Sequence, residues 1–468
     1  MEIYEQTKVV PGPRGAPLIG SALDLRRDPL GTLERAMREH GDVVRIAAGP
    51  PGARLAIYAL FHPDGVQRVF ASHAAGYRKD NQLYAELRTA IGDGLLNSQD
   101  DLWMRQRRFI QPLFTRGRIA GYAATMADET TQLLDRWRTA QANDDGGGVI
   151  DLHAEMTSLT LRIVGRVLFG SEVDEAIPIV RDAFPVLGEQ VQKRGMSPVR
   201  TPRSWPTPAN RRAAKAQRAL YGVCDALIAR RRATAPGKED MLGLLLAARD
   251  DGRGMGDDEI RDHVLVFMLA GHETTASALT FALHLLAGHP DVQRRARAEV
   301  DEVLDGRTPS AEDAPALRYT TMALKEAMRL YPPAWVVSRF AHEGDRINGY
   351  EIPPGSDLFV SPWATHRHPA FWPDPERFDP ERFAPEQETA RHRYAWVPFG
   401  GGPRACIGQH FALLEAVIVI AMVLQAYELT AMADRVPLAT KITLRPASGV
   451  PCRITPREAT ATSRPLQN

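Results

Sequence analysis

One helical segment constrains the fold more than any other part of the chain. It begins near Asp257, where Asp257, Asp258 and Glu259 place negative charge at the positive end of a helix dipole. It ends at Gly288, because a glycine followed closely by Pro290 is a typical stop signal. A helix of about 30 residues is roughly 45 Å long at 1.5 Å per residue. The sequence therefore predicts one helix that crosses the whole molecule.

Short alternating segments predict a small β-sheet beside the helices. They cover residues 42–48, 54–60, 357–360 and 441–446. Because these segments lie far apart in the chain, the sheet must combine distant pieces, while helical patterns dominate elsewhere. We expect a mainly α fold with a small β-sheet region, forming one large domain over residues 1–468. Within it, residues 1–20 form a proline-rich loop and residues from about 457 to 468 a loose tail.

Composition and charge exclude several classes of protein. Hydrophobic residues make up 44% and charged residues 25%, which is typical of a soluble globular chain. The net charge of +1 lacks the basic excess of a nucleic-acid-binding protein. Three cysteines are too few for a disulfide framework and indicate a reducing compartment. The most apolar run, residues 416–424, is shorter than the roughly 20 residues of a membrane span. We expect a cytoplasmic protein with no membrane span and no nucleic-acid partner.

The segment FGGGPRACIGQHFALLEA, which begins at Phe399, places Cys406 between glycines and an apolar helical run. A helix beginning at Cys406 would direct its N-terminal dipole at the sulfur and favour the thiolate. A thiolate held this way is a good soft metal ligand. The glycines allow a tight turn and close approach to a flat partner.

Three other interpretations of this loop stay open from the residues alone. Gly400, Gly402 and Ala405 fit GxGxxA, but that dinucleotide motif is weak and only 63 residues follow it. A catalytic nucleophile would need a histidine–asparagine partner, and none is evident in the sequence. A buried inert thiol is common for an isolated cysteine and is what we expect of Cys224 and Cys452.

The pattern FxxGxRxCxG is complete in this loop, with Phe399, Gly402, Arg404, Cys406 and Gly408 at its fixed positions. It resembles the haem-binding loop of the cytochrome P450 family. The resemblance implies haem b as cofactor, with Cys406 as the axial thiolate of the iron. It further implies that Arg404 pairs with a haem propionate and that Phe399 shields the sulfur. Thiolate ligation favours cleavage of the O–O bond.

A second motif, AGHETT, begins at Ala270 in the middle of the long helix. A zinc-protease HExxH motif is excluded because Ala276 occupies its second histidine position. A satisfied polar kink is the remaining alternative. The resemblance implies an oxygen-binding groove, in which Gly271 allows close approach to the haem. There Thr274 and Glu273 form an alcohol–acid pair that delivers protons to dioxygen.

Glu326 and Arg329 form an ExxR motif just before Tyr331, and an i, i+3 spacing places both on one helix face. Alone, such a pair is common on helix surfaces. In the family that the motif resembles, the pair joins an arginine of a later PERF sequence and locks the cysteine loop. Arg382 is the better match for that arginine, and Arg377 is the alternative.

Trp103 and Arg107 form a WxxxR motif on a basic helix, where a solvated helix face is the alternative interpretation. By resemblance both bind a haem propionate, and Arg339 fits a further propionate-binding arginine. Four more basic residues surround the motif and would steer an acidic electron donor: Arg105, Arg108, Arg116 and Arg118. No flavin or iron–sulfur segment follows in the sequence. We therefore expect a ferredoxin or flavodoxin, with an NAD(P)H-dependent reductase, to supply the electrons.

The expected reaction is insertion of one oxygen atom from O2 into a lipophilic substrate, with a terpenoid or fatty acid as the nearest analogy. Residues 193–218 hold eight basic residues and no acid, and by resemblance form a lid over the substrate channel. The helix before AGHETT and the segment after ExxR are apolar and offer no charge for a substrate carboxylate. The alternatives are a peroxide-using or isomerising haem enzyme, and a haem-binding sensor without turnover.

Overall fold

The computed structural model describes most of the chain in seven stretches. These are residues 9–50, 55–142, 148–170, 176–197, 201–234, 240–249 and 252–457. The first eight residues of the predicted N-terminal loop lie outside the described residues, as do residues 458–468 of the predicted tail.

Helices dominate the structure. The α-helices are α1 (Ala22–Arg27), α2 (Pro29–His40), α3 (Pro63–Gln67), α4 (Gln82–Ile91), α5 (Asp100–Ile110), α6 (Arg116–Gly121), α7 (Ala123–Ala142), α8 (Leu152–Phe169), α9 (Ala176–Gly195), α10 (Pro208–Thr234), α11 (Met241–Ala247), α12 (Asp257–Gly288), α13 (Pro290–Leu304), α14 (Arg318–Leu330), α15 (Pro362–Thr365), α16 (Pro385–Ala390) and α17 (Gln409–Ala426). The predicted long helix is confirmed as α12, with the predicted first and last residues.

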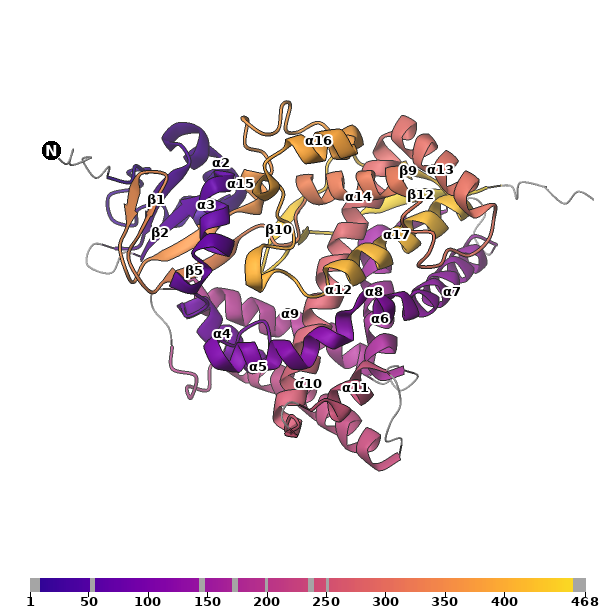
Figure 1. Cartoon of the computed structure of the whole chain (residues 1–468), viewed down its shortest axis with the longest axis horizontal. Helices are drawn as coiled ribbons and strands as arrows, with labels where there is room; N and C mark the ends of the chain where they lie inside the picture. Colours follow the sequence, from indigo (N-terminus) through magenta and orange to yellow (C-terminus); the bar gives the residue numbers. More distant parts are fainter. Residues whose placement is uncertain are drawn as a thin grey trace, which may run out of the picture.

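Helix α12 runs through the middle of the molecule, with helices on both sides of it and the main sheet at one end (Figure 1). Its length of 32 residues corresponds to roughly 48 Å. It packs against α8, α14 and α17, and most of its residues are buried. Phe281 of α12 stacks on Tyr331 at the end of α14, with ring centroids 4.3 Å apart and planes at 11°. This helix is therefore the axis around which the other elements are arranged.

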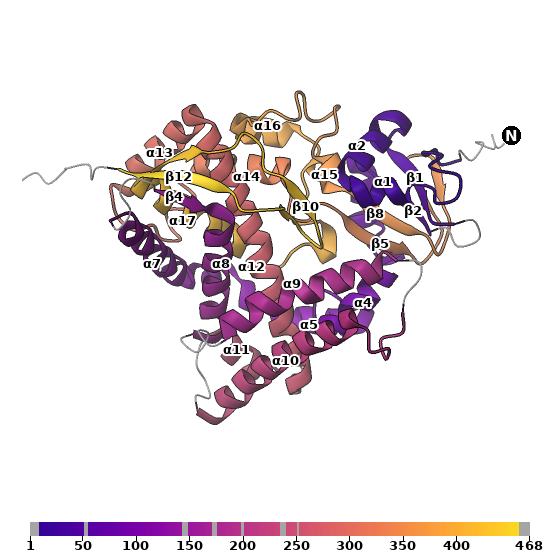
Figure 2. The same ribbon diagram turned by 180° about the vertical axis from the view of Figure 1, so that it is seen from behind.

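Short strands from distant parts of the chain form the sheets. The strands are β1 (Val43–Ala48), β2 (Leu55–Leu60), β3 (Tyr77–Arg78), β4 (Val149–Asp151), β5 (Val337–Ala341), β6 (Asp345–Ile347), β7 (Tyr350–Ile352), β8 (Asp357–Val360), β9 (Tyr427–Ala431), β10 (Leu438–Thr440), β11 (Leu444–Pro446) and β12 (Pro451–Pro456). The main sheet has the order β1-β2-β8-β5-β3 and lies at one end of the molecule (Figure 2). Strands β2 and β8 are its parallel pair, with Ile57 opposite Asp357.

Three of the four predicted strand segments meet in this main sheet, as β1, β2 and β8. The fourth, residues 441–446, does not join it, and that part of the prediction is wrong. Residues 441–443 form a turn in which the Lys441 amide donates to the Thr443 carbonyl. The remaining residues form β11, which pairs with β10 in a separate hairpin.

Two described helices, α12 and α17, are long and apolar enough to cross a membrane by length and composition alone. In their most apolar windows, 72% and 61% of the residues are buried inside the protein. The apolar run 416–424 is buried along its whole length, as we predicted for a core helix. Core helices of folded domains have the same composition, so these segments do not indicate a span.

Candidate active site

The loop before α17 has a shape that only glycine allows at one position. Gly402 has a φ of +63° and begins the 3-10 turn Gly402–Arg404. A Cβ atom built there would lie 1.8 Å from the carbonyl oxygen of Phe70. Gly400 also has a positive φ, of +69°, but its Cβ position is open. The chain therefore packs tightly against Phe70 just before it reaches Cys406.

Cys406 lies at the end of this loop, with its amide donating to the Phe399 carbonyl at 2.9 Å. Its side chain is accessible on one side, although dense protein surrounds it on the others. That burial raises the pKa of the thiol, while the Gly408 amide, Arg107 and Lys79 act in the opposite direction. A bound metal ion displaces the thiol proton, so such a site is filled in its thiolate form.

The expected helix start is corrected by the structure. Helix α17 begins at Gln409, and Gly408 is its N-cap residue. The Cys406 sulfur therefore receives a single backbone N–H, from Gly408, rather than the first turn of a helix. Residues 405–408 stay extended or turned because the preceding glycine loop must first pass Phe70.

Four predicted cationic or aromatic residues gather beside the cysteine loop. The Arg404 guanidinium lies 4.0 Å from the centre of the Trp103 ring and donates to the Ser98 carbonyl at 2.8 Å. Arg107, one turn after Trp103 on α5, donates to the Ala405 carbonyl at 3.4 Å. Arg339 is buried on β5 and donates to the Ser338 carbonyl. Burial lowers the pKa of Arg404 to about 10 and also lowers the pKa values of Arg107 and Arg339.

Lys79 joins this group and has no motif that reveals it in the sequence. Its side chain is buried, and its ammonium donates to the Leu96 carbonyl at 2.8 Å. Burial lowers the pKa of Lys79 well below its usual value, and the neighbouring Arg339 and Arg404 lower it further. Lys79 follows β3, the two-residue strand that pairs with β5 beside Arg339.

The group of four cations fits a ligand that carries carboxylates. It comprises Lys79, Arg107, Arg339 and Arg404, and none of them forms an ion pair with an acidic side chain in the described part of the chain. Buried positive charges without a counter-ion are costly, and an anionic ligand relieves that cost. Haem has two propionates and an iron that takes a thiolate, so these residues and Cys406 match its chemistry.

The AGHETT segment has accessible residues on one face and buried residues on another. Ala270 is exposed and Thr274 half-buried in the middle of a buried helix. The Thr274 hydroxyl donates to the Ala270 carbonyl at 2.5 Å. His272 lies on the opposite face, where its ring contacts Phe184 of α9 and its Nδ1 bonds the Met268 carbonyl. The open face of α12 is thus lined by Ala270 and Thr274.

Gly271 lies against α8, because a Cβ atom there would lie 2.6 Å from Val164 Cγ2. The missing side chain therefore lets α8 pack closely against α12. Close approach of Gly271 to the haem stays a prediction.

Glu273 is ion-paired, with its Oε1 3.4 Å from Arg445 Nη1 of β11. The two side chains are 21% and 29% exposed, so the pair is partly accessible. The sequence gives no sign of this contact, because the partners are 172 positions apart.

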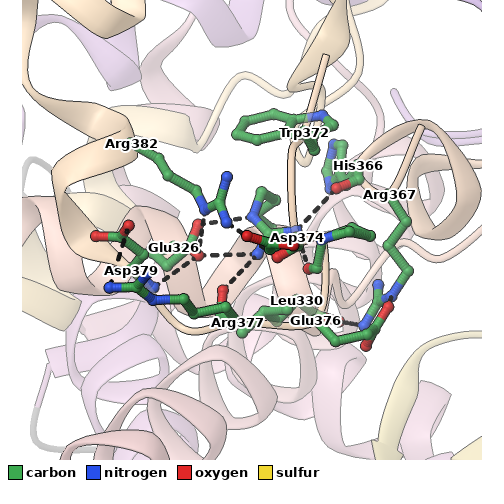
Figure 3. Close-up of polar contacts among 12 residues, drawn as sticks. Glu326, Leu330, His366, Arg367, Trp372, Asp374, Glu376, Arg377, Asp379 and Arg382 are labelled. Carbon is green, nitrogen blue, oxygen red and sulfur yellow. Dashed lines mark hydrogen bonds and ion pairs between the residues drawn. The ribbon is translucent and has the colours of Figure 1, made fainter. Parts of the chain in front are cut away.

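The ExxR pair is fully buried beneath the cysteine loop. Arg329 donates to Glu326 twice, at 2.7 and 2.8 Å, and neither side chain is exposed. Arg382, in the turn Pro380–Phe383, places its Nε 3.4 Å from Glu326 Oε1 (Figure 3). The Arg377 side chain is 70% exposed and contributes only its backbone carbonyl to Arg329. Of the two candidates, Arg382 is therefore the one that meets Glu326.

A buried histidine connects this cluster to the cysteine loop. Arg329 donates to the His366 carbonyl at 3.0 Å, and the His366 ring accepts the Val397 amide at 2.8 Å. Burial lowers the pKa of His366 well below its usual value, so the ring is neutral and able to accept. Val397 lies two residues before Phe399. The position of the loop thus depends on Glu326 through Arg329 and His366.

Comparison with known proteins places the chain among proteins with this site. The family model described as Cytochrome P450 matches residues 10–451. Cyclooctat-9-en-7-ol 5-monooxygenase of Streptomyces melanosporofaciens is 36% identical over 420 residues, which cover 89% of this chain and 88% of that protein. Pentalenene oxygenase of Streptomyces avermitilis is 34% identical over 424 residues, covering 90% and 91%.

A solved structure agrees with these relatives. The crystal structure of the cytochrome P450DA heme domain matches with a TM-score of 0.86 and 27% identity, over 97% of this chain and 99% of that one. The mainly α fold with small sheets that the sequence predicts is confirmed by this match. Proteins of this family carry haem iron with a cysteine thiolate ligand. The chain belongs to the cytochrome P450 family and is a monooxygenase.

Proposed function

We propose that this P450 oxygenates a terpenoid and that Cys406 is the thiolate ligand of its haem. One combination of features carries the assignment of the site. Cys406 is accessible, and the four cations Lys79, Arg107, Arg339 and Arg404 beside it, two of them buried and two half-buried, have no acidic ion-pair partner among the described residues. The accessible thiol suits a metal ion, and the group of cations suits the two negative charges at the edge of a porphyrin.

Different residues around Cys406 would contact different parts of the cofactor. When bound, haem with a thiolate ligand supplies the iron at which dioxygen is activated. Arg404, Arg339 and Lys79 neutralise the propionates, with Arg107 and Trp103 of α5 completing that side. The Gly408 amide donates to the sulfur and limits its negative charge. Phe399, whose ring meets Trp396 at 81°, shields the sulfur.

We assign proton delivery to residues on and beside the open face of α12. The Thr274 hydroxyl stands beside Ala270 and is held by the Ala270 carbonyl, so its oxygen has a fixed place on that face. Glu273, next along the helix, supplies the proton that the hydroxyl passes on. A hydroxyl with a fixed position would direct protons to one atom of an oxidant bound beside this face.

The substrate is expected to be an apolar terpenoid. Cyclooctat-9-en-7-ol 5-monooxygenase and pentalenene oxygenase, by their names, act on terpenoid alcohols or hydrocarbons. Several apolar residues are accessible on three elements: Leu269 and Ala270 on α12, Val336 and Val337 at the start of β5, and Ile442 in the β10–β11 hairpin. Val264 and Met268, in the apolar part of α12 before AGHETT, are fully buried and do not line this accessible surface.

A binding screen tests the substrate class. Purified protein is titrated with sesquiterpene and diterpene hydrocarbons and alcohols, and with saturated fatty acids, while the haem spin state is followed by absorbance. We expect terpenoids to shift the spin state at micromolar concentration and fatty acids to leave it unchanged. A shift with fatty acids alone would contradict the proposal, and would agree with the relative named Leukotriene-B4 omega-hydroxylase 3 of Mus musculus.

Electron supply is assigned to a separate acidic protein. Arg116 and Arg118 of α6 are exposed near α5, while Arg105 is paired with Glu259 at 2.6 Å. The exposed arginines attract a ferredoxin or flavodoxin, which is in turn reduced by an NAD(P)H-dependent reductase. We propose a cytoplasmic location, which the bacterial relatives support. Charge reversal, as in Arg116→Glu, should slow reduction by the donor and leave substrate binding unchanged.

A further inference from the structure

The β10–β11 hairpin brings a single arginine to the acid of the AGHETT segment. Arg445 of β11 lies 3.4 Å from Glu273, measured from Nη1 to Oε1. The hairpin appears in the centre of the molecule when it is seen from behind, next to α12 (Figure 2). Within the described part of the chain, Arg445 is the ion-pair partner of Glu273.

The backbone that carries Arg445 is held from several sides. The Leu444 amide donates to the Pro333 carbonyl at 2.8 Å, and the Leu444 side chain is fully buried. The Trp335 indole donates to the Lys441 carbonyl at 3.1 Å. Gln192 of α9 donates to the Thr440 carbonyl at 2.8 Å. Arg445 therefore starts from a fixed backbone, and its guanidinium determines where the Glu273 carboxylate lies.

Further titratable groups face this pair from the neighbouring elements. His153, at the start of α8, is half-buried, and its Nδ1 has no hydrogen-bond partner in the described part of the chain. Burial and the charge of Arg445 lower the pKa of His153, while Asp151 and Glu273 oppose that effect. His272, on α12 itself, also feels the Glu273 charge, although burial dominates and lowers its pKa.

We propose that Arg445 is a positioning residue for proton delivery, which holds the Glu273 carboxylate beside the Thr274 hydroxyl. The proposal rests on the role proposed above for Glu273. The cation keeps the carboxylate in place at the partly exposed end of the path. Because a small misplacement of a reacting group is costly, loss of Arg445 should weaken proton transfer without touching the haem site.

The test compares Arg445→Gln and Arg445→Lys in the haem-loaded enzyme. Arg453→Gln is the matched control, since Arg453 is exposed on the neighbouring strand β12. We expect Arg445→Gln to lower product formed per NADH about tenfold, to raise hydrogen peroxide, and to change the solvent deuterium isotope effect and the pH profile. Arg445→Lys, which keeps the charge, should restore most of the product. The ferrous–CO spectrum and substrate-induced spin shift should stay those of the wild type.

A readout independent of turnover is the titration of His153. With histidine-labelled protein, assigned through His153→Gln, the pKa of His153 should rise toward its usual value in Arg445→Gln, because a neighbouring cation is removed. An unchanged His153 titration would show that the three groups do not interact in solution and would overturn the proposal.

The double variant Glu273→Gln/Arg445→Gln separates the possible failures. If Arg445 acts through Glu273, the double variant should form as much product as Glu273→Gln alone. A further loss in the double variant would overturn the proposal and leave the role of Glu273 intact. If Glu273→Gln itself keeps full product and an unchanged isotope effect, Glu273 has no role in proton delivery. That result would contradict the proposed function of Glu273 and therefore also the proposal for Arg445. Lower thermal stability of Arg445→Gln with unchanged product per haem would make Arg445 a structural residue only and overturn the proposal.

Discussion

Glu326 and Arg329 share two hydrogen bonds, at 2.7 and 2.8 Å, with both side chains fully buried. Burial raises the pKa of Glu326, and Arg329, the Asp379 amide and Arg382 oppose that effect. Glu326→Gln should therefore leave a buried arginine without its counter-charge, at a cost of about 3–5 kcal/mol. We expect lower stability in urea and little haem per protein, measured by Soret absorbance. Full haem content in this variant would show that the cysteine loop does not depend on Glu326.

The same cluster distinguishes two arginines of the PERF repeats. Arg382→Ala should lower haem content, because Arg382 Nε lies 3.4 Å from Glu326 and its Nη2 donates to the Asp374 carbonyl. Arg377→Ala is the control, since only its backbone carbonyl contacts Arg329 and alanine keeps that carbonyl. The measurement is again Soret absorbance per protein. Equal losses in both variants would contradict the assignment of Arg382.

The glycine loop offers a matched pair of substitutions. Gly402→Ala adds a Cβ atom 1.8 Å from the Phe70 carbonyl oxygen, so the loop must move. Gly400→Ala meets open space and costs only the left-handed conformation, about 1–2 kcal/mol. We expect Gly402→Ala to have the clearly lower free energy of unfolding and to bind little haem. Equal unfolding free energies for the two variants would show that the loop relaxes away from Phe70.

Thr274→Ala should separate electron use from product formation. The variant loses the hydroxyl that donates to the Ala270 carbonyl, while Cys406 and the cation group stay in place. Hydrogen peroxide per NADH should rise several-fold and product should fall, whereas Thr274→Ser should keep most of the product. NADH, peroxide and product are measured in one reaction. Unchanged product per NADH in Thr274→Ala would assign the proton path to another group.

Glu86 of α4 connects the end of α9 with the loop before α10. It accepts from Arg194 Nε at 2.8 Å and pairs with Arg203, while Gln82 donates to the Arg194 and Ser197 carbonyls. Burial alone would raise the pKa of Glu86, but the two arginines lower it below its usual value. The stabilisation is therefore present at neutral pH and lost as the pH falls through the lowered pKa.

Glu86→Gln should lower the free energy of unfolding by about 2 kcal/mol at pH 7. The difference from wild type should shrink in acid, because the wild-type carboxylate then becomes protonated. Glu189→Gln is the control, since Glu189 on α9 is exposed. Urea titrations at several pH values measure the difference. A difference that stays constant with pH would mean that Glu86 acts by packing and not by charge.

Local patterns in the sequence were sufficient for several parts of the structure. The first-turn acids and the Gly288–Pro290 stop signal define α12 at both ends, because capping and dipole effects act within one turn. Alternating residues predicted β1, β2 and β8, because successive side chains of a strand point to opposite faces of the sheet. The FxxGxRxCxG pattern identified Cys406 and its neighbours, and the structure places Arg404, Trp103 and Arg107 together beside it.

Contacts between distant segments could not be predicted. Lys79 reaches the cation group through the two-residue strand β3, which is too short for an alternating pattern. Arg445 meets Glu273 across 172 positions, and His366 joins Arg329 to Val397 through one buried ring. The contact of Gly271 with Val164 of α8 was not predicted, because a helix sequence does not show which neighbour each face meets. Tertiary packing decides each of these cases.

The central claim is that Cys406 is the protein's ligand to haem iron. The most direct test is the ferrous–CO spectrum of Cys406→Ser beside Cys224→Ser and Cys452→Ser, whose thiols are buried elsewhere. Burial raises the pKa of Cys224 to about 12 and of Cys452 to about 11, so neither supplies a ready thiolate. We predict that Cys406→Ser loses the red-shifted Soret band of thiolate ligation and that both controls keep it. An unchanged band in Cys406→Ser, or its loss in either control, would contradict the account.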